Sequence, residues 1–197
     1  LLSRRQRQMC IRDRLGLNGT LRCDGYTARS TVDLSDADEG SVAWAGIGQY
    51  TDQVTALQFL RFMGVIAGSG EAAEPYLMQK ISRAGQTVYE AKTETTGQLL
   101  SAATATTLGG MMRSAVVNQY GAWQFGALTV CAKSGTAERE NGPADAMFAG
   151  FVQDEAYPLA FVVFAEQGGS GSQIAAPIAA KVLTACKTML DTPNPNS

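Results

Sequence analysis

The sequence predicts an α+β fold, an antiparallel β-sheet flanked by helices. Two observations lead to this prediction. Residues 123–167 show the two-residue period of strands, divided into three segments by turn-rich stretches, whereas residues 55–67, 101–119 and 172–190 show helical spacing. Because the connections between the three strands are short, neighbouring strands must run antiparallel. Helices before and after such a run of strands pack on the sheet as separate layers.

The composition fits one globular domain, or most of one, with a sizeable core. The chain has 197 residues, of which 45% are hydrophobic and 17% charged, and it contains no histidine. Catalysis by Ser-His-Asp or Cys-His groups and most zinc sites are thereby excluded. No apolar run reaches the ~18 residues that cross a bilayer. The four cysteines lack C-x-x-C spacing, and we interpret them as small buried hydrophobes rather than metal or redox groups.

The first fourteen residues differ in charge from the remainder. Residues 1–14 carry a net charge of +4, whereas the whole chain carries −2. A basic arm for nucleic acid or membrane is one interpretation. We favour the other, a non-native prefix, because QMCIRDR at 8–14 looks like a translated cloning adapter. The prefix is therefore left out of the predicted fold, and the natural protein is expected to begin upstream.

The predicted elements up to residue 70 are loops followed by a helix. Residues 15–45 are rich in Gly, Asp and Ser and predict loops with one short strand. Thr55 and Gln58 form the T-x-x-Q pattern of a capping box, which predicts a helix start. The helix that follows is apolar on nearly all faces, which predicts burial, and Gly68 and Gly70 end it.

Strands and two further helices are predicted beyond residue 70. Residues 75–81 and 86–92 predict short strands on either side of a turn, and Gly121 ends the helix at 101–119. After the three-strand segment, apolar residues recur every four positions and predict one stripe of an amphipathic helix. This stripe comprises Ile174, Ile178, Val182, Cys186 and Leu190. Residues 192–197 are expected to be a frayed tail.

The first strand of the three ends in a chemically active quartet, Lys133, Ser134, Gly135 and Thr136. Ser134 and Thr136 are two residues apart and are expected to point to one face, with Gly135 pointing away. Two hydroxyls beside an ammonium can hold a carboxylate through charge-assisted hydrogen bonds. Glycine leaves the backbone open, so an extended peptide could pair with this edge as an added strand. Alternatively, these are plain strand residues and Lys133 only protects a sheet edge.

The quartet, followed by Ala137 and Glu138, resembles the third active-site motif of the penicillin-binding proteins and serine β-lactamases. GIGQY (46–50) with VTALQ (54–58) resembles the I-G-Q-G … T-P-L-Q segment of class B penicillin-binding proteins, with Ala56 where that family often has Pro. Four further stretches resemble the elements around the motif strand in the family's order: MMRSAVVNQYG (111–121), MFAGFV (147–152), AFVVFAE (160–166) and GSGSQIAAPIAAKVL (169–183). Residues 15–191 thus resemble the C-terminal part of a transpeptidase domain, an incomplete penicillin-binding protein/serine β-lactamase-like fold.

Two family motifs are not found in this sequence. No serine begins S-x-x-K, which supplies the nucleophile and its activating lysine, and none begins S-x-N. LGLN at 15–18 resembles the segment that follows the S-x-N helix, so we expect both motifs upstream. The resemblance implies that the parent protein is a serine-type D-Ala-D-Ala transpeptidase of peptidoglycan cross-linking and that this fragment alone is inactive.

The resemblance also implies roles, ligands and a location. Lys133 would stabilise charge, Ser134 and Thr136 would hold the carboxylate of a peptidoglycan stem peptide ending in D-Ala-D-Ala, and Gly135 would leave room for it. β-Lactams mimic this peptide and stall the acyl-enzyme. No metal, cofactor or nucleic acid is implied, and the membrane is reached only through a missing N-terminal anchor. The protein is expected at the outer face of the cytoplasmic membrane, periplasmic or extracellular, with cell-wall synthesis proteins as partners.

Three alternatives stay open. A β-lactamase or carboxypeptidase has the same fold, although the GIGQY and VTALQ segments favour the transpeptidases. A β-lactam-sensing receptor domain is acylated without turnover. A non-catalytic scaffold has lost its nucleophile. The sequence upstream of Leu15 distinguishes these alternatives, because a scaffold encodes no S-x-x-K there.

Overall fold

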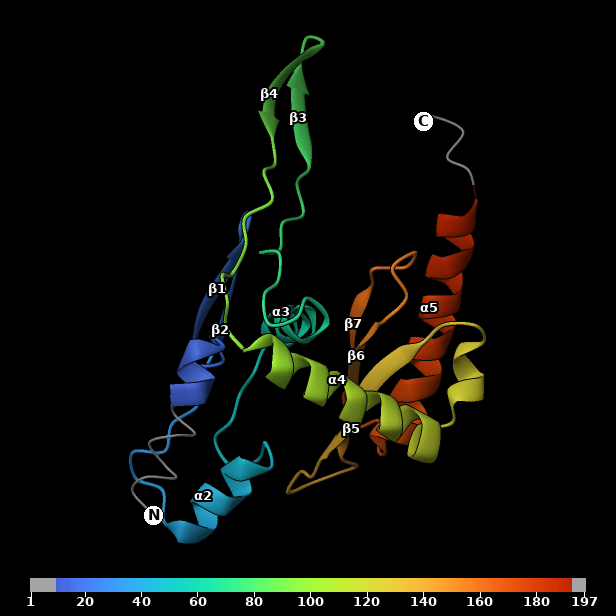
Figure 1. The fold of residues 1–197 in the computed structure, drawn as a ribbon. Helices are drawn as coiled ribbons and strands as arrows, with labels where there is room; N and C mark the ends of the chain where they lie inside the picture. The colour runs from blue at the N-terminus through green and yellow to red at the C-terminus, as the bar shows by residue number, and fades with distance from the viewer. Residues whose placement is uncertain (1–9, 193–197) are drawn as a thin grey trace. The chain divides into compact units, whose positions relative to one another are not determined.

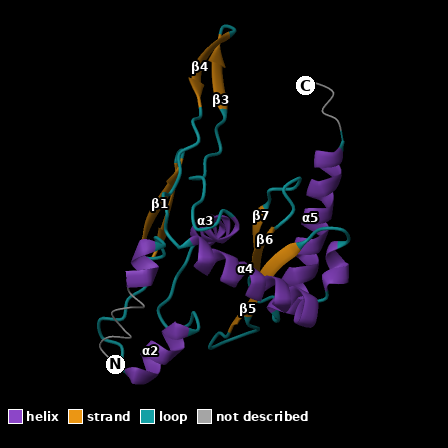
Figure 2. Cartoon of the chain, viewed as in Figure 1, coloured by secondary structure: helices purple, strands orange, loops and turns teal. Residues whose placement is uncertain are grey.

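The structure is a computed structural model that describes residues 10–192, and the chain forms two compact units. The first unit comprises residues 10–62 and 71–99, and the second comprises residues 63–70 and 100–192. The boundary between them falls inside helix α3 (Ala56–Ala67). Figures 1 and 2 show the helices and strands of both units.

The first unit contains two separate β-hairpins, which run from blue to green in Figure 1. They pair β1 (Gly19–Cys23) with β2 (Tyr26–Ser30), and β3 (Lys80–Arg83) with β4 (Gln86–Glu90). The loop of the second hairpin is Ala84 and Gly85, whose φ angles are 50° and 78°. Two positive φ angles are the signature of a two-residue type I′ turn. The predicted hairpin is confirmed, with a first strand that begins later than expected.

The prediction of loops over residues 15–45 is wrong. This stretch holds the β1–β2 hairpin and a helix, α2 (Glu39–Gly46). Burial alternates along β1, where Leu21 and Cys23 are buried and their neighbours are not. An Asp-Gly pair follows at 24–25, and such a pair between alternating residues is a strong hairpin signal. The many Gly, Asp and Ser residues of this stretch therefore form the turn of a hairpin and the cap of a helix, and do not indicate loops throughout.

Side-chain caps begin helices α2 and α3. The Asp38 carboxylate accepts the amide of Ser41 at 2.7 Å. Thr55 Oγ1 accepts the amide of Gln58 at 3.3 Å, which confirms the predicted helix start. The reciprocal half of the capping box is not formed, because the Thr55 amide donates to Ser30 Oγ at 3.0 Å. Gln58 Oε1 has no hydrogen-bond partner within the described residues.

The second unit is a three-stranded antiparallel sheet with helices on both faces, which confirms the α+β prediction. The strands lie in the order β5 (Val130–Ala137), β6 (Asp145–Val152) and β7 (Ala160–Ala165). The helical elements are α4 (Ala102–Ala115), the π-helical turn η1 (Val116–Tyr120), the 3-10 turn η2 (Ala122–Phe125), the π-helical turn η3 (Gly171–Ala175) and α5 (Ala176–Asp191).

Alternate residues of the sheet pack against different helices. Phe148 is fully buried in a core that joins β5, β6 and β7 to α5 and η1. On the opposite face, a Cβ added at Gly109 of α4 would lie 3.4 Å from Phe151 of β6. The glycine in the middle of α4 thus allows the helix close to the sheet. Gly121 ends the helical stretch with a φ of 84°, as predicted.

The predicted stripe on the last helix does not form the buried face of α5. Its members Ile174, Ile178, Val182 and Leu190 are all at least 41% exposed. The face toward the core is built from small residues and one leucine: Ala176, Ala179, Ala180 and Leu183. Alanines let the helix axis approach the sheet closely, so the larger side chains lie on the other side. When a helix is apolar on two faces, the spacing of its apolar residues does not tell which face is buried.

The described residues bear on three smaller predictions. Residues 1–9 and 193–197 lie outside them, so the non-native prefix 1–14 and the frayed tail 192–197 stay predictions. Within the prefix, Arg12 forms an ion pair with Asp52 at 3.0 Å. All four cysteines are free. Cys23 and Cys131 are buried as expected, whereas Cys10 is exposed and Cys186 is half-buried.

Candidate functional site

The predicted quartet lies on β5, an edge strand of its sheet in the described part of the chain. Along such an edge, alternate backbone groups are not used by the sheet. Side chains occupy three of the backbone groups on β5, one of which is the Ser134 carbonyl, an acceptor from Lys133 Nζ. The Val130 carbonyl accepts from Arg113 Nη1 at 3.0 Å, and the Ser134 amide donates to the Tyr120 hydroxyl at 3.2 Å. The strand is thus fixed from its open side as well as by β6.

Lys133 supplies an exposed positive charge at this edge. Its register partner on β6 is Ala149, and its ammonium donates to the carbonyl of Ser134 at 2.6 Å. None of the ion pairs formed among residues 10–192 involves Lys133. A carbonyl neutralises no charge, so the ammonium can still attract a carboxylate.

Tyr120 is a site residue that the sequence analysis missed. Ser134 Oγ donates to its hydroxyl at 3.0 Å, in addition to the bond from the Ser134 amide. The ring is buried and packs edge-on against Phe148, with centroids 5.4 Å apart and planes at 81°. Phe148 lies directly opposite Ser134 in the β5–β6 register. Ring packing therefore places the Tyr120 hydroxyl at the second residue of the quartet.

The surroundings of Tyr120 lower the pKa of its hydroxyl. Burial raises the pKa of the phenol, but the two hydrogen bonds from Ser134 and the charge of Lys133 outweigh burial, so the pKa lies below its ordinary value. Both bonds from Ser134 are accepted by the phenol oxygen, so neither uses the phenol's own proton. Tyr120 can therefore donate that proton to an anion that approaches the edge.

Thr136, Gly135 and Gly171 lie where β5 meets η3. Thr136 Oγ1 accepts the amide of Gly171 at 3.2 Å, which leaves the threonine proton available to a ligand. A Cβ at Gly171 would lie 2.2 Å from the carbonyl oxygen of Gly135 and 2.4 Å from that of Met147. A Cβ at Gly135 would lie 2.9 Å from Met147 Cε. Only glycine fits at position 171, where the neighbouring atoms are backbone, whereas at position 135 the flexible end of Met147 could shift.

The structure places Ser134 and Thr136 in different local settings. Strand alternation keeps both side chains on one face, with Gly135 pointing the other way. However, the Ser134 hydroxyl is held by Tyr120 of η1, whereas the Thr136 hydroxyl is held by the first residue of η3. The four residues together offer an ammonium, two hydroxyls and an open strand edge, which can hold a carboxylate and an extended peptide.

Within residues 10–192, no group of three or more His, Cys, Asp or Glu side chains could hold a metal ion. In the same range, no helix is both long and apolar enough to cross a membrane.

Comparison with known proteins shows the family and the fold of the chain. Residues 19–184 match the family model described as the penicillin binding protein transpeptidase domain. The chain is 29% identical over 160 residues to a protein of Mycolicibacterium smegmatis named peptidoglycan D,D-transpeptidase PbpA. The match covers 75% of this chain and 32% of the relative, so the chain spans about a third of that protein's length.

Solved structures show the same fold. Penicillin-binding protein A of M. tuberculosis, in a ceftriaxone acyl-enzyme complex, is 25% identical to this chain and superposes with a TM-score of 0.81. The match covers 89% of this chain and 42% of the chain of that structure. The D,D-transpeptidase domain of a peptidoglycan glycosyltransferase from Eggerthella lenta is 24% identical, with a TM-score of 0.78 over 92% of this chain and 47% of its own.

Proposed function

This chain belongs to the penicillin binding protein transpeptidase domain family, and on that basis we propose that it carries the substrate-carboxylate half of a D,D-transpeptidase site. The parent protein forms an acyl-enzyme on peptidoglycan stem peptides that end in D-Ala-D-Ala. The observation that carries the proposal is the quartet at 133–136 on an open strand edge, with an exposed ammonium that is in no ion pair within the described residues.

Each residue of the quartet has a role that its contacts support. Lys133 attracts the terminal carboxylate and stabilises negative charge as the amide is attacked. Thr136 donates its free proton to the same carboxylate, since its oxygen already accepts from Gly171. Gly135 leaves the backbone open for the extended peptide. Ser134 donates its hydroxyl proton to Tyr120 at 3.0 Å, so Ser134 acts on the carboxylate through the Tyr120 hydroxyl, whose own proton is free.

The parent reaction proceeds in two acyl transfers. The serine hydroxyl of the upstream S-x-x-K motif loses its proton to a base and attacks the carbonyl carbon of the D-Ala-D-Ala amide. The C–N bond breaks, the leaving nitrogen takes up a proton, and D-alanine departs from a serine ester. An amine of a neighbouring stem then attacks the ester, forms the cross-link amide and returns the proton to the serine oxygen. In a β-lactam, the cleaved C–N bond belongs to the ring, so the leaving amine stays attached.

We place the nucleophile outside this chain, because the sequence has neither S-x-x-K nor S-x-N. The fragment alone is therefore inert toward β-lactams and substrate. The parent protein acts at the outer face of the cytoplasmic membrane, where peptidoglycan is assembled, and cell-wall synthesis proteins are its expected partners.

Covalent labelling with fluorescent penicillin tests the proposal. The complete gene product, folded and purified, should label on a serine upstream of Leu15, and this chain should not label. Pre-incubation with unlabelled penicillin should abolish the signal. A folded complete protein that does not label would remove the transpeptidase assignment, and labelling of the isolated chain would show that the nucleophile lies within residues 1–197.

A further inference from the structure

A glycine-rich segment, residues 167–171, leads from β7 into η3 and ends against the quartet. Its last residue, Gly171, donates its amide to Thr136 Oγ1 at 3.2 Å. Because the threonine oxygen accepts this bond, the Thr136 proton stays free for another acceptor at the strand edge. The hydrogen bond lasts only while the glycine-rich segment stays against β5, so whatever holds the segment also holds Thr136 ready for a ligand.

The glycine-rich segment is not held by its own local structure. Gln167 and Gly169 have φ angles of 52° and 85°, in the left-handed region. A side chain other than glycine adopts this region only at a cost, so Gln167 is unfavourable there by itself. Ser170 precedes η3, and its side chain caps no amide of that turn. The segment therefore needs an anchor from another element.

Asp145, the first residue of β6, is that anchor. Its Oδ1 accepts the amide of Gln167 at 2.8 Å, and its Oδ2 accepts from Arg139 Nε at 2.7 Å. Next to it in the chain, the carbonyl of Ala144 accepts the amide of Gly169 at 2.7 Å. Bonds to a carboxylate are stronger than bonds between neutral groups. One carboxylate thus joins the β5–β6 loop to the segment that leads into η3.

Close backbone contacts connect the two ends of the glycine-rich segment. A Cβ at Gly168 would lie 2.9 Å from the carbonyl oxygen of Ala165, and one at Gly171 would lie 2.2 Å from that of Gly135. The segment therefore lies directly on the ends of β7 and β5, with little room between the chains. A shift of its first residue is expected to move Gly171 relative to the quartet.

The bond to Gln167, and not the ion pair, is the contact of Asp145 that matters for the site. Arg139 and Asp145 are both partly exposed, and such a pair adds little to stability. Arg139 also lies in the β5–β6 loop, so its bond to Asp145 does not reach the glycine-rich segment. The Gln167 amide belongs to that segment, four residues before Gly171.

We propose that Asp145 is a positioning residue for the carboxylate half of the site. It holds the glycine-rich segment so that the Gly171 amide stays on Thr136 Oγ1 and the Thr136 proton is available to the carboxylate of the substrate. Asp145 acts through Thr136 and is not itself a catalytic residue. The inference rests on the proposed function for the role of Thr136, whereas the anchoring of the segment by Asp145 does not depend on that function.

Acylation of the complete protein by benzylpenicillin and by its methyl ester, which lacks the carboxylate charge, tests this role. The unchanged protein should be acylated faster by penicillin than by the ester. Asp145→Ala should reduce the ratio of the two rates by about tenfold, because Thr136 no longer donates reliably to the carboxylate. Asp145→Asn should keep most of the ratio, since its amide oxygen can still accept from Gln167. Arg139→Ala should keep it as well.

Asp154→Ala is the matched control, because Asp154 has the same kind of contact at the other end of β5. Its carboxylate accepts the amide of Thr129 at 2.7 Å. This variant should lose stability and keep the ratio of the unchanged protein. If Asp145→Ala also keeps that ratio, or if Asp154→Ala loses as much of it, Asp145 has a structural role only and the inference is overturned.

Hydrogen exchange of the Gly171 amide, followed by NMR in the ¹⁵N-labelled chain, tests the anchor without reference to the proposed function. Asp145→Ala should speed this exchange by about tenfold, and Asp154→Ala should leave it unchanged. Equal exchange in the Asp145→Ala variant and the unchanged chain would overturn the inference. Failure of the complete unchanged protein to react with penicillin would instead count against the proposed function, so the two failures are distinguishable.

Discussion

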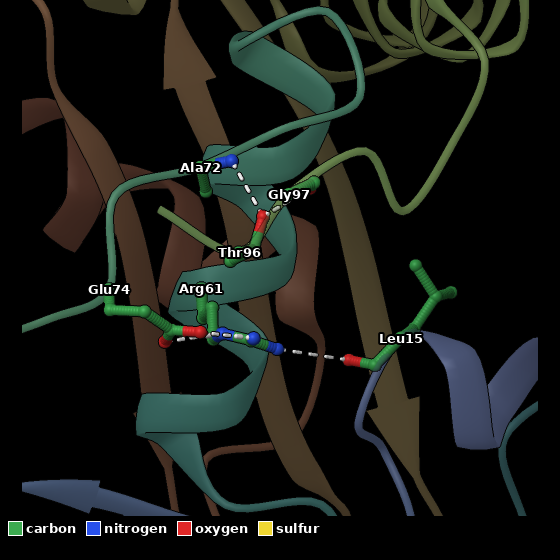
Figure 3. A network of polar contacts seen from close by, with 6 residues as sticks. All are labelled: Leu15, Arg61, Ala72, Glu74, Thr96 and Gly97. Carbon is green, nitrogen blue, oxygen red and sulfur yellow. Dashed lines mark hydrogen bonds and ion pairs between the residues drawn. The ribbon is translucent and has the colours of Figure 1, made fainter. Parts of the chain in front are cut away.

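The two units of the chain are stabilised by different means. The second unit has one continuous apolar core, in which the rings of Tyr120, Phe125 and Phe161 surround Phe148. In the first unit, one core cluster joins only Val32, Leu34 and Ala45. Three polar contacts also join segments that are far apart in its sequence: Arg12 with Asp52, Arg61 with Glu74 (Figure 3), and Asp24 with the backbone of residues 77–78.

This difference separates rigid from adaptable parts. Apolar packing is dense and insensitive to salt, so it can hold β5 and the quartet at fixed positions. Ion pairs and single hydrogen bonds are directional and are weakened by salt when partly exposed. The second unit, which holds the proposed acyl-transfer residues, is therefore expected to unfold at a higher denaturant concentration than the first unit. The substitutions below test that contrast.

The largest effect on stability is expected from the ring at the centre of the core. Phe148→Ala removes a fully buried side chain with three aromatic neighbours and should lower the free energy of unfolding by about 3–5 kcal/mol. Phe164→Ala on β7 is the matched control, because Phe164 is 48% exposed, and it should cost less than about 1 kcal/mol. Chemical denaturation measures both. Equal losses would mean that the core is not continuous around Phe148.

A smaller loss is expected from the ion pair of the first unit. Arg61→Ala leaves Glu74 without its partner in a partly buried setting and should cost about 2 kcal/mol, less than a fully buried pair would. Arg83→Ala, an exposed arginine of β3, should cost less than about 0.5 kcal/mol. Denaturation at low and high salt separates the two. If the Arg61 variant loses no more free energy of unfolding than the Arg83 variant, the ion pair of Arg61 and Glu74 does not stabilise the first unit.

Tyr120→Phe keeps the ring in the core and removes only the hydroxyl. The Ser134 amide and hydroxyl lose their partner, and stability should fall by about 1 kcal/mol. In the complete protein, the rate of acylation by penicillin should fall by about tenfold, because the phenol proton that the carboxylate would accept is removed. An unchanged rate together with lower stability would confine Tyr120 to a packing role.

The smallest effect is a dependence on alkaline pH. The pKa of Tyr120 is lower in the folded state than in the unfolded chain, so its ionisation favours folding. This contribution is present above the unfolded pKa and is lost as pH falls through the folded pKa. Tyrosinate absorbance should show a step below the ordinary pKa of a phenol. Tyr120→Phe should remove that step and Lys133→Met should shift it upward; a step unaffected by both belongs to another tyrosine.

The sequence predicted the second unit better than the first. The meander β5–β7 follows from a two-residue period and short turns, and these signals are local. The β1–β2 hairpin was missed although the Asp-Gly pair at 24–25 marks its turn, because the Gly, Asp and Ser content was taken to indicate loops. The buried face of α5 was missed because alanines pack closer to a sheet than the isoleucines beside them.

Likewise, the sequence analysis predicted only those residues of the candidate site that are adjacent in the sequence. Lys133 to Thr136 lie side by side in the sequence, so their chemistry is visible there. Tyr120 is 14 residues before Ser134, and nothing in its local pattern separates it from a core tyrosine. Gly171 is 35 residues after Thr136 and meets it only once η3 packs on the sheet. Such contacts depend on the tertiary fold, which no local pattern encodes.

The rate of acylation of the complete protein by penicillin, measured for Lys133→Ala, tests the central role of the β5 edge most directly. Removal of the ammonium should slow acylation by about 10²–10³-fold without loss of folding, because the charge acts on the developing oxyanion and the bound carboxylate. Lys80→Ala, an exposed lysine of β3, should leave the rate unchanged. A Lys133→Ala protein that is acylated as fast as the Lys80→Ala protein would contradict the assignment of the quartet.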